Sequence, residues 1–296
     1  MLRHWLLAAR PKTLPVAMAP VIVGTALAWA ESGRVDAGVT LVILAAAILI
    51  QIGTNLHNDV ADHERGADLP ETRLGPPRAT AEGWLEPPRV RAMAGLAFLA
   101  AAGLGIWLIL RGGWPIALIG ALSLAAGWAY SGGPRPISYS SLGELFVWLF
   151  FGVIAVAGTY YLQAGGITSG ALLAGAALGM PAAAVLVVNN YRDLVNDRRA
   201  GRQTFAVRFG RPASRLQYAL LMLLPFVLVP WLDAARPFWW LLVCGALPLA
   251  AVLVARFVRT APGPAFNELL AATARFHLVF GILLCAAVIA ATLATL

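Results

Sequence analysis

The sequence predicts an all-α membrane protein whose helices cross the bilayer and pack into one bundle. Three observations support this fold class: hydrophobic residues make up 60% of the 296 residues, charged residues make up only 12%, and the mean hydropathy is +0.76. Soluble domains average about half apolar and about a quarter charged residues. The composition therefore argues against a soluble globule and makes the lipid bilayer the expected environment.

Nine segments of the sequence are apolar over the roughly 20 residues that a transmembrane helix needs. Prolines and glycines inside several of them are tolerated in packed membrane helices. The division between the third and fourth segments depends only on Arg111, Gly112 and Gly113. We therefore expect nine transmembrane helices, at about 13–31, 38–57, 90–110, 113–131, 141–163, 168–190, 214–233, 236–256 and 275–296.

The basic residues predict the orientation of the bundle. With the N-terminus in the cytoplasm, all but three of the 22 arginine and lysine residues (Arg34, Arg111 and Arg236) fall at cytoplasmic ends of the spans. Cytoplasmic loops of membrane proteins carry an excess of basic residues. We therefore expect a multi-pass protein of the inner (cytoplasmic) membrane whose long polar loops, 58–89 and 191–213, face the cytoplasm. The same distribution explains the pI near 10.3, so no nucleic-acid partner is expected.

Two polar blocks follow the second and sixth apolar segments, and they share a pattern. The first, 55–78, reads NLHNDVAD and later RLGPPR; the second, 189–213, reads NNYRDLVND and later RFGRPA. Each has an asparagine four residues before an aspartate and an Arg-x-Gly sequence farther on. Similarity at corresponding places indicates a duplicated helical unit that faces itself within one domain, 1–296.

The spacing of the acids places them on helix faces. Residues three or four apart share one face of a helix, so each block forms one polar stripe. The stripes consist of Asn55, Asp59 and Asp62 in the first block and Asn189, Asp193 and Asp197 in the second. One aspartate alone would be an ordinary solvated helix end, but two facing stripes place four carboxylates around one site, which needs cations. Mg²⁺ prefers carboxylate oxygens and often binds phosphate oxygens as well, so the pattern predicts a magnesium-bound diphosphate.

These two blocks resemble the aspartate-rich motifs of the UbiA superfamily of intramembrane prenyltransferases. Within it, the chain is most similar to the 1,4-dihydroxy-2-naphthoate polyprenyltransferases of menaquinone biosynthesis. Four passages carry the narrower resemblance: ARPKTLPVAMAPVIVG at 9–24, NLHNDVADHERGAD at 55–68, YSGGPRPISYSSLGELFVWLFFG at 130–152 and NNYRDLVNDRRAGRQTFAVRFG at 189–210. The resemblance implies a nine-helix bundle with a central cavity open to the membrane, two Mg²⁺ ions, a polyprenyl diphosphate donor and an aromatic acceptor.

The resemblance also implies which residues act. Asn55, Asp59, Asp62, Asp193 and Asp197 match the motif positions and are expected to bind metal, the four aspartates also being catalytic. One position departs from the broader superfamily, which often has an aspartate where this chain has Gly66, while Asp68 follows two residues later. Support of the metal ligands and handling of the acceptor both remain open as roles for Asp68.

Further residues are expected to bind substrate, among them Asn55 and Asn189 of the two stripes. Lys12, the only lysine, is expected to be catalytic by binding a substrate anion together with Arg10, the alternative being a basic residue that flanks the first span. The phosphate candidates are Arg73, Arg78, Arg135, Arg202 and Arg208, of which Arg73 and Arg208 occupy matching places in the two blocks. Tyr130 and Tyr139 could stabilise an allyl cation through their ring faces or anchor the chain at the membrane interface.

The expected reaction is Mg²⁺-dependent transfer of a polyprenyl group to 1,4-dihydroxy-2-naphthoate with loss of CO₂ and pyrophosphate, giving demethylmenaquinol. The first alternative is a related enzyme that acts on 4-hydroxybenzoate, a haem or a chlorophyllide. The second is a secondary transporter, for which internal repeats are also typical. Transporters commonly keep ionisable groups near the bilayer midplane, whereas the acids here cluster at one face, with Glu144 early in the fifth span as the main exception.

Overall fold

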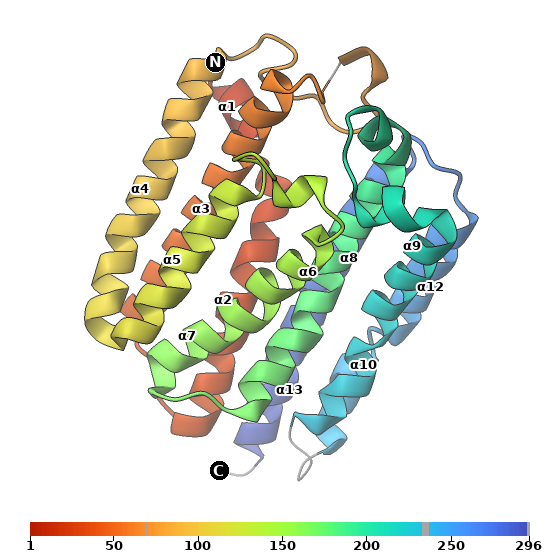
Figure 1. Cartoon of the computed structure of the whole chain (residues 1–296). Coiled ribbons are helices and arrows are strands. Elements are labelled where there is room, and N and C mark those ends of the chain that lie inside the picture. Colours follow the sequence, from red (N-terminus) through yellow and green to blue (C-terminus); the bar gives the residue numbers. More distant parts are fainter. Residues whose placement is uncertain (69, 233–236, 295–296) are drawn as a thin grey trace.

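The computed structural model describes residues 1–68, 70–232 and 237–294, and its regular elements there are all helical (Figure 1). Eight helical segments of this described part are long and apolar enough to cross a membrane, namely Leu2–Ser32, Ala37–Glu64, Pro87–Gly112, Gly143–Ala164, Ser169–Arg199, Phe205–Trp231, Phe238–Arg259 and Phe266–Leu293. The shorter apolar helix Trp114–Ala129 occupies the place of the fourth predicted span. The multi-pass fold is thus confirmed, while nine crossings and their orientation stay predictions; Arg236 and the span ends predicted at 233, 236 and 296 lie outside the described residues.

Several segments consist of more than one element. In chain order the first half comprises α1 (Leu2–Ala9), η1 (Pro11–Thr13), α2 (Leu14–Ser32), α3 (Ala37–Glu64), η2 (Pro70–Thr72), α4 (Pro87–Gly112), α5 (Trp114–Ala129), η3 (Ile137–Tyr139), α6 (Gly143–Trp148), the π-helix η4 (Leu149–Ile154) and α7 (Ala155–Ala164). The second half comprises α8 (Ser169–Arg199), α9 (Phe205–Leu223), α10 (Pro225–Leu228), η5 (Val229–Trp231), η6 (Pro237–Trp240), α11 (Leu241–Cys244), α12 (Leu247–Arg259) and α13 (Phe266–Leu293).

Three of the long helices, α3, α8 and α9, begin at side chains that cap them. The carboxylate of Asp36 accepts a hydrogen bond from the Val39 backbone N–H at 3.0 Å, where α3 begins. Thr168 caps α8 in the same way, and Thr204 caps α9. Such oxygens satisfy backbone N–H groups that have no partner inside the first turn of a helix. The cap at Thr204 begins a helix within the second polar block, after its acidic stripe.

Helices α3 and α8 continue well beyond their apolar segments. The apolar spans were predicted to end at 57 and 190, but the helices run on to Glu64 and Arg199, so the acidic stripes are helical, as their spacing predicts. Their 28 and 31 residues correspond to about 42 Å and 46 Å at 1.5 Å per residue, against roughly 30 Å of hydrocarbon. Hydropathy marks where a helix leaves lipid, whereas its backbone hydrogen bonds continue into the polar region.

Helix α8 lies at the centre of the bundle, where glycines let backbones meet. A Cβ atom on Gly152, in η4, would lie 2.5 Å from the carbonyl oxygen of Gly175 and 2.6 Å from the Cα of Gly179 on α8. Small residues at such crossings allow the close backbone approach on which helix packing in lipid depends. Near its C-terminal end, α8 is fixed by stacked rings: the centroid of Tyr191 lies 5.2 Å from that of Phe266.

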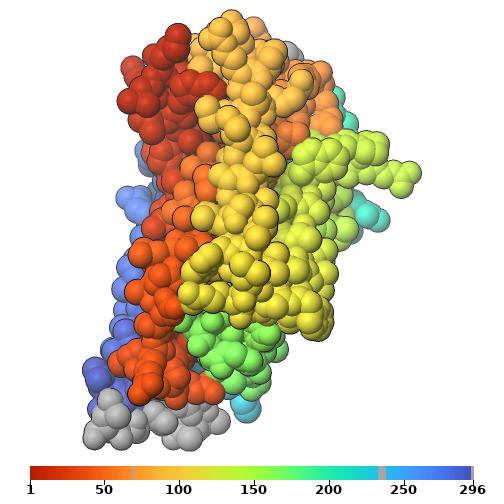
Figure 2. All heavy atoms as spheres, turned by 90° about the vertical axis from the view of Figure 1, so that its left-hand side faces the viewer, coloured from red at the N-terminus to blue at the C-terminus, as the bar shows by residue number. Residues whose placement is uncertain are grey.

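The two ends of the bundle differ. The N-terminus, the end of α3 and the loop 65–86 lie at one end, and the C-terminal end of α13 lies at the other (Figure 1). Figure 2 shows the side formed by α3, α4 and α5, where large apolar side chains such as Leu41, Leu99, Ile106, Leu110 and Leu118 are exposed. Exposed apolar side chains along whole helices are what a lipid-facing surface requires.

Candidate active site

The first acidic block lies on the last turns of α3 and is almost fully buried. Asp59 and Asp62 are each 1% exposed, and Asn55 is 5% exposed. The side-chain amide of Asn55 donates to the carbonyl oxygen of Ala9 at 3.0 Å and to Oγ1 of Thr13 at 3.1 Å. Asn55 therefore ties α3 to the bend between α1 and α2.

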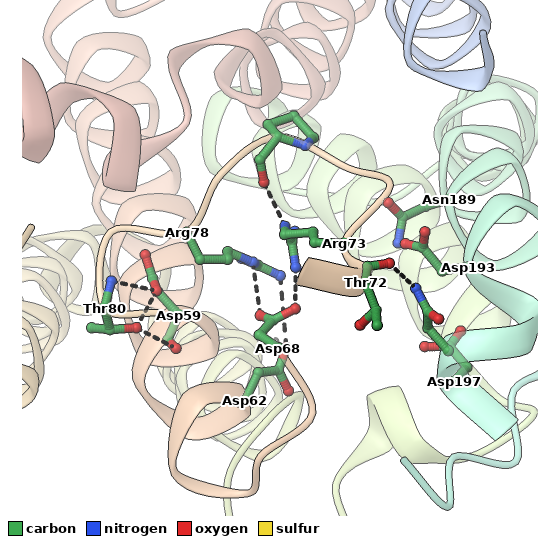
Figure 3. Close-up of polar contacts among 12 residues, drawn as sticks. Asp59, Asp62, Asp68, Thr72, Arg73, Arg78, Thr80, Asn189, Asp193 and Asp197 are labelled. Carbon is green, nitrogen blue, oxygen red and sulfur yellow. Dashed lines mark hydrogen bonds and ion pairs between the residues drawn. The ribbon is translucent and has the colours of Figure 1, made fainter. Parts of the chain in front are cut away.

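The carboxylate of Asp59 holds the loop that follows α3. It accepts hydrogen bonds from the backbone N–H groups of Ala79, at 3.1 Å, and Thr80, at 3.2 Å, and from the Thr80 hydroxyl (Figure 3). All three donors are buried with it. A charged acceptor with three such donors closes the loop 65–86 over the end of the helix.

Asp68 joins the same region through two arginines. It pairs with Arg73, and its Oδ2 lies 3.1 Å from Nε of Arg78 (Figure 3). Arg78 also approaches Asp62, with 3.6 Å between Nη2 and Oδ2. Burial raises the pKa of Asp68, Arg73 opposes that effect, and Asp62 adds to it. Asp68 thus lies beside the acidic stripe of the first block as part of an acid–arginine network.

The second block, on the last turns of α8, has different partners. Asp193 is bound by its neighbour Arg192, with 2.8 Å from Nε to Oδ1 and 2.6 Å from Nη2 to Oδ2. Arg192 in turn donates to the side-chain oxygens of Asn189, at 2.8 Å, and Asn267, at 2.6 Å. The side chain of Asp193 is 20% exposed, which makes it the more accessible partner of this pair.

The loop after α3 reaches across to the second block. Asn196 on α8 donates to the carbonyl oxygen of Thr72 at 2.7 Å, and Asn267 on α13 donates to that of Leu74 at 2.9 Å. A Cβ atom on Gly75 would lie 2.7 Å from Nη2 of Arg192, so glycine lets the loop pass directly over this guanidinium. Both acidic blocks therefore lie under one loop (Figure 3).

Arg202 joins the two blocks directly. Its Nη2 lies 2.6 Å from Oδ1 of Asp62, and its Nη1 lies 3.5 Å from Oδ1 of Asp197. Burial alone lowers the pKa of Arg202, but the carboxylates of Asp62 and Asp197 outweigh it, so the pKa lies above its ordinary value. The guanidinium also lies over the ring of Tyr139, 4.8 Å from its centroid. One cation thus bridges an aspartate from each block.

The side chains present fit a metal-bound diphosphate. Within the described residues, no three His, Cys, Asp or Glu side chains stand together as a ready metal site, and arginines pair with Asp62 and Asp193. Carboxylate oxygens are nevertheless the donors that Mg²⁺ prefers, and buried N–H groups of Arg10, Arg78 and Arg202 have no hydrogen-bond partner. Guanidinium donors of this kind bind phosphate oxygens.

The structure brings most of the predicted residues together. Besides the aspartates, it gathers Arg73, Arg78, Arg202 and Tyr139 around the two blocks, and Asp59 is the acid with the largest electrostatic effect on Arg10. Tyr130 caps α5, where burial and then the charge of Glu144 raise its pKa. Lys12, Arg135 and Arg208 are exposed, and no ion pair links them to an acid within the described chain.

Some residues at the site carry no clear signal in the sequence. Thr80 anchors Asp59 without any recognisable spacing, and Arg192 stands in the second block as one of many basic residues. Arg65 also contributes: it donates to the carbonyl oxygens of Ser131 and Gly133 and lies 5.5 Å from the ring centroid of Tyr139.

Comparison with known proteins identifies the family. The model of the UbiA prenyltransferase family matches residues 17–280. The chain belongs to this family. It is 41% identical over 250 residues to 1,4-dihydroxy-2-naphthoate octaprenyltransferase from Mycobacterium tuberculosis, with 83% of each protein covered. It is 38% identical to the enzyme of the same name from Escherichia coli, over 74% of this chain and 72% of that one.

Solved structures of UbiA homologues show the same fold. A UbiA homologue from Archaeoglobus fulgidus bound to DMAPP and Mg²⁺ superimposes with a TM-score of 0.66 at 13% identity, over 95% of this chain and 99% of that one. A homologue from Aeropyrum pernix gives a TM-score of 0.68 at 14% identity, over 95% and 98%. Because the family is one of prenyltransferases, the match favours an enzyme over the secondary transporter.

Proposed function

We propose that this protein transfers a polyprenyl group from polyprenyl diphosphate to 1,4-dihydroxy-2-naphthoate, with Mg²⁺, releasing CO₂ and pyrophosphate and forming demethylmenaquinol. The observation that supports it most is the Arg202 bridge, which joins an aspartate from each block beside buried, unpaired guanidinium N–H groups. The acceptor follows from relatives at 41% and 38% identity that are named for it.

The aspartates and arginines have separate tasks in this proposal. Asp59, Asp62, Asp193 and Asp197, with Asn55, would hold the metal. Bound Mg²⁺ stabilises the negative charge that grows on the leaving diphosphate. Arg78 and Arg202 can turn their unpaired N–H groups to the phosphate oxygens and bind them more tightly as this charge develops.

The allyl cation left by ionisation needs surroundings that exclude water. The helices that carry the acidic stripes are apolar along most of their length, and Tyr139 lies beneath Arg202 with its hydroxyl buried and without a hydrogen-bond partner. A ring face can stabilise a cation within about 6 Å of its centroid. Tyr139 and Tyr130 are therefore the proposed partners of the cation.

The proposed location follows from charge and shape. The protein is an integral multi-pass membrane protein, and the acidic blocks gather at the end of the bundle that holds the N-terminus (Figure 1). We place this end at the cytoplasmic side of the inner membrane because the basic residues concentrate there. A water-soluble diphosphate head and a lipid-soluble prenyl tail both reach a site in this position.

The test is turnover of 1,4-dihydroxy-2-naphthoate with a long polyprenyl diphosphate and Mg²⁺ in purified protein. We expect the wild type to form the prenylated product and Asp193→Asn to lose nearly all turnover while it elutes as a folded protein. Asp36→Asn is a matched control, since Asp36 caps α3 at the opposite end and should leave turnover unchanged. Prenylation of 4-hydroxybenzoate alone would contradict the proposed acceptor, and full activity of Asp193→Asn would contradict the proposed site.

A further inference from the structure

One buried acid has no part in the site described so far. Glu144 lies in the first turn of α6 and is 4% exposed. The start of α6 is packed closely against α8, since a Cβ atom on Gly143 would lie 3.2 Å from Cδ2 of Leu186. An ionisable side chain inside a membrane protein is costly, and such residues mark functional sites by default.

The two oxygens of the Glu144 carboxylate differ. Oε1 accepts a hydrogen bond from the side-chain amide of Asn190 at 2.9 Å, and Asn190 is itself buried. Oε2 is buried without a hydrogen-bond partner. A buried polar atom without a partner is destabilising, because it has lost its hydrogen bonds to water and gained none. The arrangement therefore fixes the carboxyl group with one oxygen and leaves the other free for a donor.

The position of Asn190 relates Glu144 to the acidic stripe. Asn190 precedes Asp193 by three residues and Asp197 by seven, so all three lie near one face of α8. Asn190 is about 4–11 Å farther from the C-terminal end of the helix than these aspartates, at 1.5 Å per residue. Glu144 thus lies on the membrane side of the region where the diphosphate would bind.

Tyr130 links the two regions electrostatically. After burial, the charge of Glu144 has the largest effect on the pKa of Tyr130 and raises it, while Arg202 lowers it and Asp62 raises it. Tyr130 therefore lies within the electrostatic influence both of Glu144 and of the Arg202–Asp62 pair that joins the two blocks.

We propose that Glu144 is a catalytic residue that binds a hydroxyl of the aromatic acceptor through Oε2 and accepts its proton, with Asn190 as the positioning residue. This inference rests on the proposed function. As the ring attacks, a π pair of the ring forms the new C–C bond to the allyl carbon. The O–H bond breaks, its electron pair becomes the π bond of a ring carbonyl, and the proton passes to Oε2. The pair of the broken C–O bond leaves with pyrophosphate.

The experiment combines a variant of the protein with altered acceptors. Glu144→Gln keeps the shape and an oxygen for Asn190 but removes the base. Loss of a general base typically costs 10²–10⁴-fold in rate, so we expect kcat/KM for 1,4-dihydroxy-2-naphthoate to fall about 100-fold or more. Mg²⁺-dependent binding of the prenyl diphosphate should stay within twofold. Glu31→Gln is the control, because Glu31 pairs with Tyr160 at the other end of the bundle.

The 1-O-methyl and 4-O-methyl ethers of the acceptor identify the hydroxyl. Methylation of the hydroxyl that Glu144 binds should lower wild-type kcat/KM to the value that Glu144→Gln shows with the unmethylated acceptor. With this ether, Glu144→Gln and the wild type should have the same kcat/KM. If Glu144→Gln lowered kcat/KM for both ethers as much as it does for the unmethylated acceptor, the proposal would be overturned. Turnover of the unmethylated acceptor by Glu144→Gln within threefold of the wild type would also overturn it. Loss of prenyl diphosphate binding in a folded Glu144→Gln would also overturn it.

Two further measurements distinguish loss of the base from misfolding, and failure of the Glu144 role from failure of the proposed function. Glu144→Asp retains the carboxyl group and should keep more turnover than Glu144→Gln; equal losses in two folded variants would contradict proton acceptance. If Glu144→Gln does not fold, Glu144→Asp carries the same ether comparison. If the wild type does not prenylate 1,4-dihydroxy-2-naphthoate, the proposed function fails, and the same variants are assayed with 4-hydroxybenzoate, where an unchanged kcat/KM overturns the role of Glu144.

Discussion

The two acidic blocks have nearly the same spacing but different partners. In the first block, Asp59 accepts hydrogen bonds from backbone and hydroxyl groups of Ala79 and Thr80. In the second, the corresponding Asp193 is bound by a charged neighbour, Arg192, and is partly exposed. Asp59 therefore helps to fold its own loop, whereas Asp193 is accessible at the edge of the site.

This difference shows how a repeated motif divides its tasks. The first block fixes the loop 65–86, which in turn covers the second block through Thr72 and Leu74. The second block supplies Arg202, whose guanidinium contacts Asp62 of the first block and Asp197 of its own. Equal spacing in sequence thus predicts equal placement on a helix, but not equal chemistry, since the loops around the two helices differ.

The largest expected effect on stability comes from removing Arg202, the residue that joins the two blocks. Arg202→Ala leaves Asp62 and Asp197 buried without their shared cation, and breaking a buried ion pair typically costs about 3–5 kcal/mol. We expect a large fall in Tm in EDTA. Because Mg²⁺ can replace the lost positive charge, added Mg²⁺ should raise the Tm of Arg202→Ala more than that of the wild type.

The matched control for this variant is Arg198→Ala, since Arg198 is exposed on the last turn of α8. It removes the same charge from the same end of the helix and should change the Tm little. Equal Tm values for Arg202→Ala and Arg198→Ala in EDTA would show that the bridge does not stabilise the protein.

The next largest effect should distinguish Asp59 from Asp193. Asp59→Asn puts an amide group where a carboxylate binds three donors, so at least one donor loses its partner, at a cost of about 2–3 kcal/mol. Asp193→Asn changes a partly exposed group whose partner Arg192 keeps its hydrogen bonds to Asn189 and Asn267, so it should cost less than Asp59→Asn. Thermal unfolding in detergent and turnover are measured for both variants. Asp59→Asn should lose both stability and activity, whereas Asp193→Asn should lose activity alone. Equal stability of the two variants would contradict the division of tasks.

A smaller effect is expected from the loop itself. Thr80→Val keeps the shape of a buried side chain but removes the hydroxyl that binds Asp59, at a cost of about 1 kcal/mol. Thr72→Val is the control, because Thr72 is exposed and contributes only its backbone carbonyl oxygen. Limited proteolysis within 65–86 should be faster for Thr80→Val alone. Equal cleavage rates in both variants would exclude Thr80 as the anchor of the loop.

The sequence predicted the fold well because hydropathy and helix spacing are local properties. Each of the nine predicted spans overlaps a helical segment, while the short helix Leu2–Ala9 was missed because Arg10 and Pro11 interrupt the pattern. The aspartates were placed correctly at the ends of two helices. The matching of Arg73 with Arg208 did not extend to the structure, where Arg73 binds Asp68 and Arg208 is exposed over Phe209.

The contacts made by loops could not be read from spacing. The anchoring of Asp59 by Thr80 joins residues 21 apart in the chain, and the contact between Arg202 and Asp62 joins both halves of the molecule. Neither contact leaves a periodic pattern, because irregular backbone brings these groups together. The same reason separates two predicted phosphate-binding residues: Arg202 bridges the blocks, whereas Arg135 is exposed.

The smallest expected effect concerns Lys12, the proposed anion-binding residue beside the first block. Lys12 is exposed in η1, next to Thr13, whose hydroxyl oxygen accepts a hydrogen bond from Asn55. A guanidinium keeps the charge of an ammonium but not its compact shape, so Lys12→Arg should lower kcat/KM about threefold, or about 0.6 kcal/mol. Steady-state kinetics with each substrate varied in turn would show which anion is affected. Unchanged values for both substrates would leave Lys12 as a basic residue that flanks α2, and would confine substrate binding to the buried arginines that contact the two blocks.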